Sequence, residues 1–144
     1  MYKRQAKFFS KYVNYPVVSD DSGLCIEALG NKPGIHSARF AKNNGGFFKA
    51  MKLILKKIEK KKNRKAFFVC NLSYKDINKK IISVEDRVYG KISNKILGKK
   101  GFGYDPIFIP DNEKFTFGQM LKSKKIKIDH RFKAFKKLKK KIRI

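Results

Sequence analysis

The chain reads Ser19-Asp20-Asp21-Ser22-Gly23 directly after the apolar run 15–18, Tyr-Pro-Val-Val. This pattern predicts a short buried strand that ends in two neighbouring carboxylates and is followed by a tight turn. Such a place suits a hard cation, because Mg²⁺ prefers oxygen ligands and often bridges to phosphates. Acids are scarce here, with 11 Asp and Glu against 37 Lys and Arg, so an adjacent pair is informative. The alternative is a strand-end turn in which the Asp side chains cap local N–H groups.

The length and composition predict one globular domain. The chain has 144 residues, of which 42% are hydrophobic, so it is long enough to form its own core. It contains no apolar run of membrane-spanning length and no visible signal peptide, and we expect no membrane contact. Cys25 and Cys70 lack the spacing of metal ligands. We interpret them as small buried residues in a reducing compartment, the cytoplasm.

The formal net charge of +26 has two interpretations. A basic surface binds nucleic acid by releasing counterions. Alternatively, the lysines reflect a general composition in which Lys, Ile, Asn and Phe are all abundant. The aromatic residues are not interleaved with the lysine runs as a single-strand binder requires, which disfavours nucleic acid as a partner. A polyanionic substrate such as a nucleoside triphosphate is attracted under either interpretation.

Hydrophobic periodicity predicts alternating helices and strands, and therefore an α/β or α+β class. We expect helices over 5–14, 47–60 and 132–142, with Asp129 as the N-cap of the last one. We expect strands over 17–18, 24–29, 66–74, 81–89 and 106–110. The hairpin of 66–74 with 81–89 is the strongest strand signal. A glycine-rich loop is predicted over 97–104, and a basic loop over 122–127.

Two further clusters have residue types that suit a nucleotide. Glycines on both sides of Phe102 let the backbone approach a ligand closely, and Phe102 offers a flat face for a base. The alternative there is a hairpin loop with an aromatic plug. In the segment 34–40, His36 and Arg39 are within reach of a phosphate if it binds nearby, or are ordinary surface residues.

The last cluster surrounds the start of the final predicted helix. Lys125, His130 and Arg131 lie near a helix N-terminus, a combination that favours anions. The alternative is that Lys125 is one of many solvated lysines. His130 is the more informative residue, because the chain has only two histidines.

Taken together and in this order, the stretches 19–41, 101–110 and 125–138 resemble the inosine/xanthosine triphosphate pyrophosphatase family. The resemblance extends from Ala6 to the C-terminus. It implies one domain over 1–144, in which helices flank a mixed central β-sheet and two lobes enclose a nucleotide cleft. It also implies Mg²⁺ as cofactor, a homodimer, and a purine nucleoside triphosphate as substrate. The implied reaction converts inosine, deoxyinosine or xanthosine triphosphate to the monophosphate and pyrophosphate.

The resemblance also implies roles for individual residues. Asp21 corresponds to the Mg²⁺ ligand and proton acceptor, and Asp20 would support the metal or the water. The segment Ser37–Arg39 matches the family's Ser-Ala-Arg motif. Phe102 is placed to stack on the purine, and the His-Arg pair to contact the base. The implied substrate-binding residues are Ser22, Phe102, Gly103, Tyr104, Asp105, Lys125, His130 and Arg131.

The start of the chain departs from the family pattern. Family members open with a strand, a Thr/Ser-x-Asn-x-x-Lys loop that grips the triphosphate, and a segment with a further Mg²⁺ carboxylate. We expect this first strand–loop–helix to be missing, and residues 1–5 to be foreign to the family. The polypeptide as written is then predicted to be weakly active or inactive. The alternatives are an inactive fragment, a basic nucleic-acid-binding protein, or a related septum inhibitor, which the His-Arg pair and the stretch 102–106 disfavour.

Overall fold

A five-stranded sheet with helices on both sides forms the fold, in a computed structural model that describes residues 3–77 and 80–142. The strand order is β2-β1-β3-β4-β5, and all neighbouring pairs are antiparallel. The strands are β1 (Val17–Ile26), β2 (Lys32–Gly34), β3 (Lys65–Lys75), β4 (Ile82–Ile92) and β5 (Phe108–Pro110). The predicted hairpin is confirmed, since Phe67 of β3 pairs with Tyr89 of β4.

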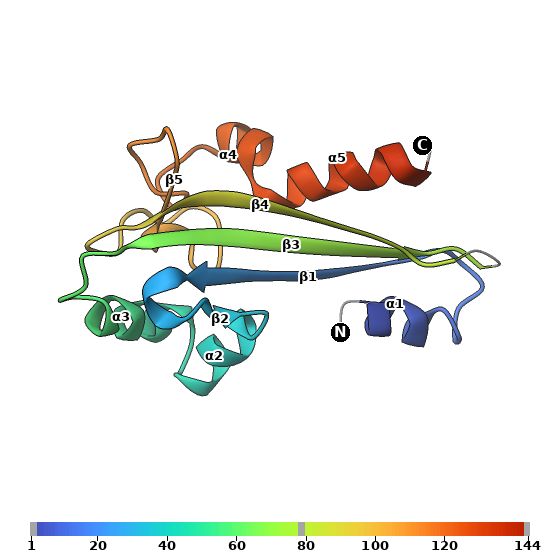
Figure 1. The fold of residues 1–144 in the computed structure, drawn as a ribbon, viewed down its shortest axis with the longest axis horizontal. Helices are drawn as coiled ribbons and strands as arrows, with labels where there is room; N and C mark the ends of the chain where they lie inside the picture. The colour runs from blue at the N-terminus through green and yellow to red at the C-terminus, as the bar shows by residue number, and fades with distance from the viewer. Residues whose placement is uncertain (1–2, 78–79, 143–144) are drawn as a thin grey trace.

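Within the described part of the chain, five helices cover this sheet. They are α1 (Lys3–Phe9), α2 (Ser37–Asn43), α3 (Phe47–Lys57), α4 (Lys122–Ile128) and α5 (His130–Ile142), with 3₁₀ turns at Glu27–Leu29 and Asp105–Ile107. In Figure 1, α1, α2 and α3 lie below the three long strands, and α4 and α5 lie above them. The predicted class, a sheet flanked by helices, is confirmed, but the sheet was expected to be mixed and its described strands pair only in the antiparallel sense. None of the described helices combines the length and the apolar character needed to cross a membrane.

The prediction of a turn after Asp21 is wrong. Strand β1 continues without interruption through the acidic pair to Ile26, and Ser22 and Gly23 pair with β3. Glycine is needed at position 23 for a reason other than a turn. A Cβ at that position would lie 1.9 Å from the carbonyl oxygen of Gly34 in β2. The glycine therefore permits the close approach of β2 to β1.

Two other expectations about elements need correction. The predicted basic loop over 122–127 is helix α4, which is consistent with the good helix propensity of lysine and the absence of Gly and Pro. The first helix ends at Phe9 instead of residue 14. Of the five residues predicted to be foreign to the family, Lys3–Gln5 form the first turn of α1, and residues 1–2 lie outside the described part of the chain. That prediction stays untested.

The main core lies between β1, β3 and α3, where Leu24, Ile54 and Phe68 are buried together. A second cluster, which includes Leu72 and Leu138, joins β3 and β4 to α5. The predicted N-cap of α5 is confirmed, because the carboxylate of Asp129 accepts a hydrogen bond of 2.7 Å from the backbone N–H of Phe132. This packing and this cap place the first turn of α5 over the sheet.

Candidate functional site

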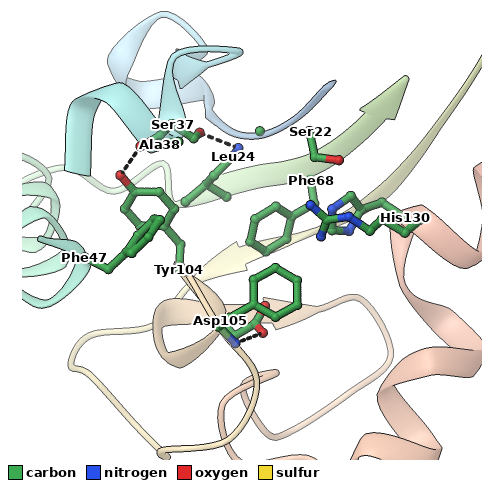
Figure 2. Close-up of a pocket in the computed structure, with 13 residues that line it drawn as sticks. Ser22, Leu24, Ser37, Ala38, Phe47, Phe68, Tyr104, Asp105 and His130 are labelled. Atoms are coloured by element: carbon green, nitrogen blue, oxygen red, sulfur yellow. Dashed lines mark hydrogen bonds between the residues drawn. The ribbon is translucent and has the colours of Figure 1, made fainter. Parts of the chain in front are cut away.

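One pocket gathers three segments that are far apart in the sequence (Figure 2). Ser22 of β1, the loop 102–105 and the pair His130–Arg131 of α5 all line it, and α2 and α3 close its far side. Seven of the ten residues that were predicted for the site therefore share one cavity: Ser22, Phe102, Gly103, Tyr104, Asp105, His130 and Arg131.

A buried ion pair shapes the loop beside this pocket. The carboxylate of Asp105 accepts hydrogen bonds from Lys125 Nζ at 2.6 Å and from the backbone N–H of Phe102 at 2.8 Å. Gly101 has a φ of 73°, and a Cβ there would lie 2.1 Å from the Asp105 carboxylate, so the turn requires glycine. Burial raises the pKa of Asp105, and the hydrogen bond from Lys125 opposes this rise. Lys125 lies outside the residues that line the first pocket and instead lines a neighbouring one, with Nζ 4.4 Å from the Phe102 ring centre.

His130 lines the pocket and has a buried nitrogen without a hydrogen-bond partner in the described part of the chain. Its side chain is 3% exposed and stacks on Phe68, with ring centres 4.9 Å apart and an interplanar angle of 9° (Figure 2). Nδ1 is buried and has no hydrogen-bond partner among the described residues. Burial, followed by the charges of Arg131 and Lys125, lowers the pKa of His130 to about 3. The imidazole is therefore neutral near pH 7, and a neutral imidazole has one donor and one acceptor.

The Ser-Ala-Arg segment begins with a structural serine. Ser37 Oγ accepts a hydrogen bond of 2.9 Å from the N–H of Leu24 and donates one of 2.7 Å to the carbonyl of Gly34. The carbonyl of Ser37 accepts a hydrogen bond of 2.8 Å from the Tyr104 hydroxyl (Figure 2). Burial raises the pKa of Tyr104 to about 12, so this phenol stays a donor. These bonds hold α2 against β1 and against the 101–105 loop.

Two aromatic residues of the pocket were not predicted from the sequence. Phe68 of β3 forms its floor under His130, and Phe47 of α3 packs edge to face on Tyr104 with ring centres 5.2 Å apart. The sequence predicts a buried strand over 66–74, but a buried strand does not tell which of the two faces of the sheet carries a ligand.

The structure does not bring Asp20 and Asp21 into one site. Neighbouring residues of a strand point to opposite faces, and the two carboxylates follow this rule. Asp20 faces α5, where it accepts a hydrogen bond of 2.7 Å from Arg131 Nε. Asp21 instead lines a second cavity together with residues of α1 and α2, among them Arg4 and Arg39. The predicted pair is therefore divided between the two faces of strand β1, and only Asp21 lines one of these two cavities.

The second cavity combines one acid with several basic side chains. Asp21 is half-buried and receives no hydrogen bond or ion pair from the described residues, while Arg4, His36 and Arg39 line the same cavity. Among residues 3–77 and 80–142, no cluster of three or more His, Cys, Asp or Glu is arranged to hold a metal. Mg²⁺ is commonly bound by only one or two carboxylates, with substrate phosphates and waters as the other ligands. Asp21 fits that requirement as a single protein ligand.

Comparisons with known proteins agree on one family. The sequence profile of the Ham1 family matches residues 2–141. A dITP/XTP pyrophosphatase of Dictyoglomus thermophilum is 42% identical over 138 residues, which cover 94% of this chain and 67% of that protein. The Ham1 protein of Staphylococcus aureus superposes with a TM-score of 0.90 and 34% identity, covering 96% of this chain and 72% of the other. A HAM1 protein of Coxiella burnetii gives a TM-score of 0.88 and 30% identity, with 96% and 73% covered.

Proposed function

The chain belongs to the Ham1 family, and on that premise we propose that it hydrolyses non-standard purine nucleoside triphosphates, such as dITP and XTP, to the monophosphate and pyrophosphate. One observation carries the proposal. Ser22, the loop 102–105 and the pair His130–Arg131 line a single pocket, and the half-buried Asp21 lines the cavity on the other face of the same strand. The first pocket suits a purine, and the second suits phosphates and a cation.

Purine binding is assigned to the first pocket. Phe102 is 61% exposed, and we assign its ring to stacking on a base, next to the Lys125 and Arg131 cations that lie over it. We assign the contact with the base edge to the His130 imidazole, whose Nδ1 has no hydrogen-bond partner among the described residues. A site that hydrogen-bonds a 6-keto purine leaves a buried polar group unpaired when a 6-amino purine enters, and this penalty gives selectivity.

Charge neutralisation and water activation are assigned to the second cavity. Asp21 would hold Mg²⁺, which when bound supplies positive charge to the phosphates and to the attacking water. The Asp21 carboxylate orients this water and accepts its proton as the anhydride between the α and β phosphates is cleaved. Arg39 and His36 line the same cavity, where their donors would face the departing pyrophosphate.

The test measures turnover and product binding separately. Pyrophosphate release is followed with protein in excess over inosine, xanthosine, adenosine and guanosine triphosphates, so that a single turnover is detected. Binding of inosine monophosphate is measured by calorimetry. We expect Mg²⁺-dependent release that prefers inosine and xanthosine, and we expect Asp21→Asn to abolish it while the monophosphate still binds. A chain that neither binds inosine monophosphate nor releases pyrophosphate contradicts the proposal.

A nucleic-acid-binding function predicts a different result. Binding to DNA or RNA would fall steeply with salt and would be unaffected by Asp21→Asn. Fluorescence anisotropy with a short labelled RNA at two salt concentrations distinguishes the two functions.

Two further properties follow from the family resemblance and remain proposals. We propose that the protein is a homodimer, since large hydrophobic residues such as Tyr12, Tyr15 and Tyr89 are more than half exposed on the described surface. We also propose a cytoplasmic location, since Cys25 and Cys70 are buried free thiols, as expected in a reducing compartment. Light scattering coupled to size exclusion tests the dimer.

A further inference from the structure

We propose that Asp20 is a positioning residue that orients Arg131 toward the base, and that it does not bind the metal. The inference rests on the proposed nucleotide function. It starts from the ion pair between Arg131 Nε and Asp20 Oδ2, 2.7 Å apart, which joins β1 to the first turn of α5 at the wall of the first pocket.

The contacts of Asp20 leave it few free acceptors. One oxygen is occupied by Arg131, and the other accepts hydrogen bonds from Ser22 Oγ at 2.5 Å and from Cys70 Sγ at 3.7 Å. A cation bound to the same carboxylate would lie close to the guanidinium and be repelled by it. The carboxylate of Asp21 forms no ion pair among the described residues. A cation bound to Asp21 would therefore not be repelled by a paired guanidinium.

The contact also determines what Arg131 presents to a ligand. A guanidinium has five N–H donors, and Asp20 takes the one on Nε. The described residues provide no hydrogen-bond acceptor for the remaining four, which lie on the two terminal nitrogens. The guanidinium carbon lies 5.0 Å from the centre of the Phe102 ring, next to the position assigned to the purine. Asp20 thus keeps the free donors of Arg131 beside the base.

This pair contributes little to stability, so its variants should fold. The side chains of Arg131 and Asp20 are 39% and 35% exposed, and ion pairs this exposed to water contribute little to stability. Asp20→Asn is the informative change, because it removes the charge and leaves one carbonyl acceptor for the two donors, Arg131 Nε–H and Ser22 Oγ–H, that the carboxylate accepts from.

Asp86→Asn is a matched control. Asp86 of β4 pairs with Lys137 of α5 at 3.0 Å, so this pair also joins a strand to α5, but neither residue lines the pocket. The experiment compares the wild type, Asp20→Asn and Asp86→Asn in three measurements. These are the affinity for inosine monophosphate, the Mg²⁺ concentration that gives half-maximal single-turnover rate, and the NMR signal of the Arg131 Nε–Hε group in the free protein.

We expect Asp20→Asn to weaken inosine monophosphate binding about tenfold, the effect of one lost hydrogen bond to a charged group. It should also shift the Arg131 Nε–Hε signal and leave the Mg²⁺ midpoint unchanged, whereas Asp86→Asn should change none of the three. A raised Mg²⁺ midpoint with unchanged monophosphate affinity would make Asp20 a metal ligand and overturn the inference. An unmoved Arg131 signal would also overturn it. A wild-type protein that binds no inosine monophosphate refutes the proposed function instead, and the NMR signal then decides whether the pair exists.

Discussion

Replacing His130 by glutamine should remove a large part of the pH dependence of stability. The folded-state pKa of His130 is lowered from 6.5 to about 3, mainly by burial. Below pH 6.5 the unfolded chain therefore binds a proton that the folded chain does not bind. The stabilising contribution of neutral His130 to the free energy of unfolding is fully present above pH 6.5. It decreases by about 1.4 kcal/mol per pH unit as the pH falls from 6.5 toward 3.

The magnitude between pH 7 and pH 5 follows from these two values. At pH 5 the unfolded histidine is almost fully protonated and the folded one is still neutral, so acidification costs about 2 kcal/mol at this residue. The raised pKa of Asp105 acts in the opposite direction, because a carboxyl that holds its proton more tightly when folded favours folding at lower pH. That contribution is shared by the wild type and the variant, so the difference between the two proteins isolates His130.

The assay is urea unfolding at pH 7 and pH 5, followed by far-ultraviolet circular dichroism because the chain contains no tryptophan. Wild type should lose about 2 kcal/mol more than His130→Gln on this acidification. The control is His36→Gln, which removes the other histidine, an exposed one, and should behave like wild type. If His130→Gln keeps the wild-type pH dependence, the buried imidazole is not neutral in the folded state. The proposal that a neutral His130 contacts the base edge then fails.

Three further substitutions test the packing around the pocket. Gly23→Ala places a methyl group 1.9 Å from a backbone carbonyl of β2 and should cost about 1 to 3 kcal/mol in urea unfolding, with an unchanged value contradicting the close approach. Ser37→Ala leaves the buried N–H of Leu24 without its acceptor and should cost about 1 to 3 kcal/mol, detectable also as faster hydrogen exchange of that amide. Lys125→Met leaves Asp105 as an unpaired buried charge and should cost about 3 to 5 kcal/mol. Adding Asp105→Asn should recover part of that loss, and a double variant as unstable as the single one would show that the charge is not the cause.

Long periodic segments of the fold could be predicted from the sequence. Helix α3 has a broad apolar face, and the β3–β4 hairpin has two strands rich in aromatic and β-branched residues, so local pattern and tertiary packing agree there. The N-cap at Asp129 was also predictable, because capping depends on a side chain only three residues from its partner.

The errors occurred where tertiary pairing overrides local preference. Ser, Asp and Gly favour turns, yet residues 19–23 remain extended because β3 pairs with them over their whole length. This error concealed the main feature of the site. Had the strand been recognised, the alternation of side chains would have placed Asp20 and Asp21 on opposite faces. The stacking of His130 on Phe68, which are 62 residues apart, has no sequence signal at all.

Strand β1 has a further consequence for how the protein behaves in concentrated solution. It pairs with β2 only over Leu24–Ile26, so within the described chain residues 17–23 have a strand neighbour on one side alone. An open backbone edge is a template for strand addition by another molecule, and charged side chains on such an edge discourage it. Neutralising the two acids is therefore expected to promote fibrillar self-association during refolding, a colloidal property that is separate from catalysis.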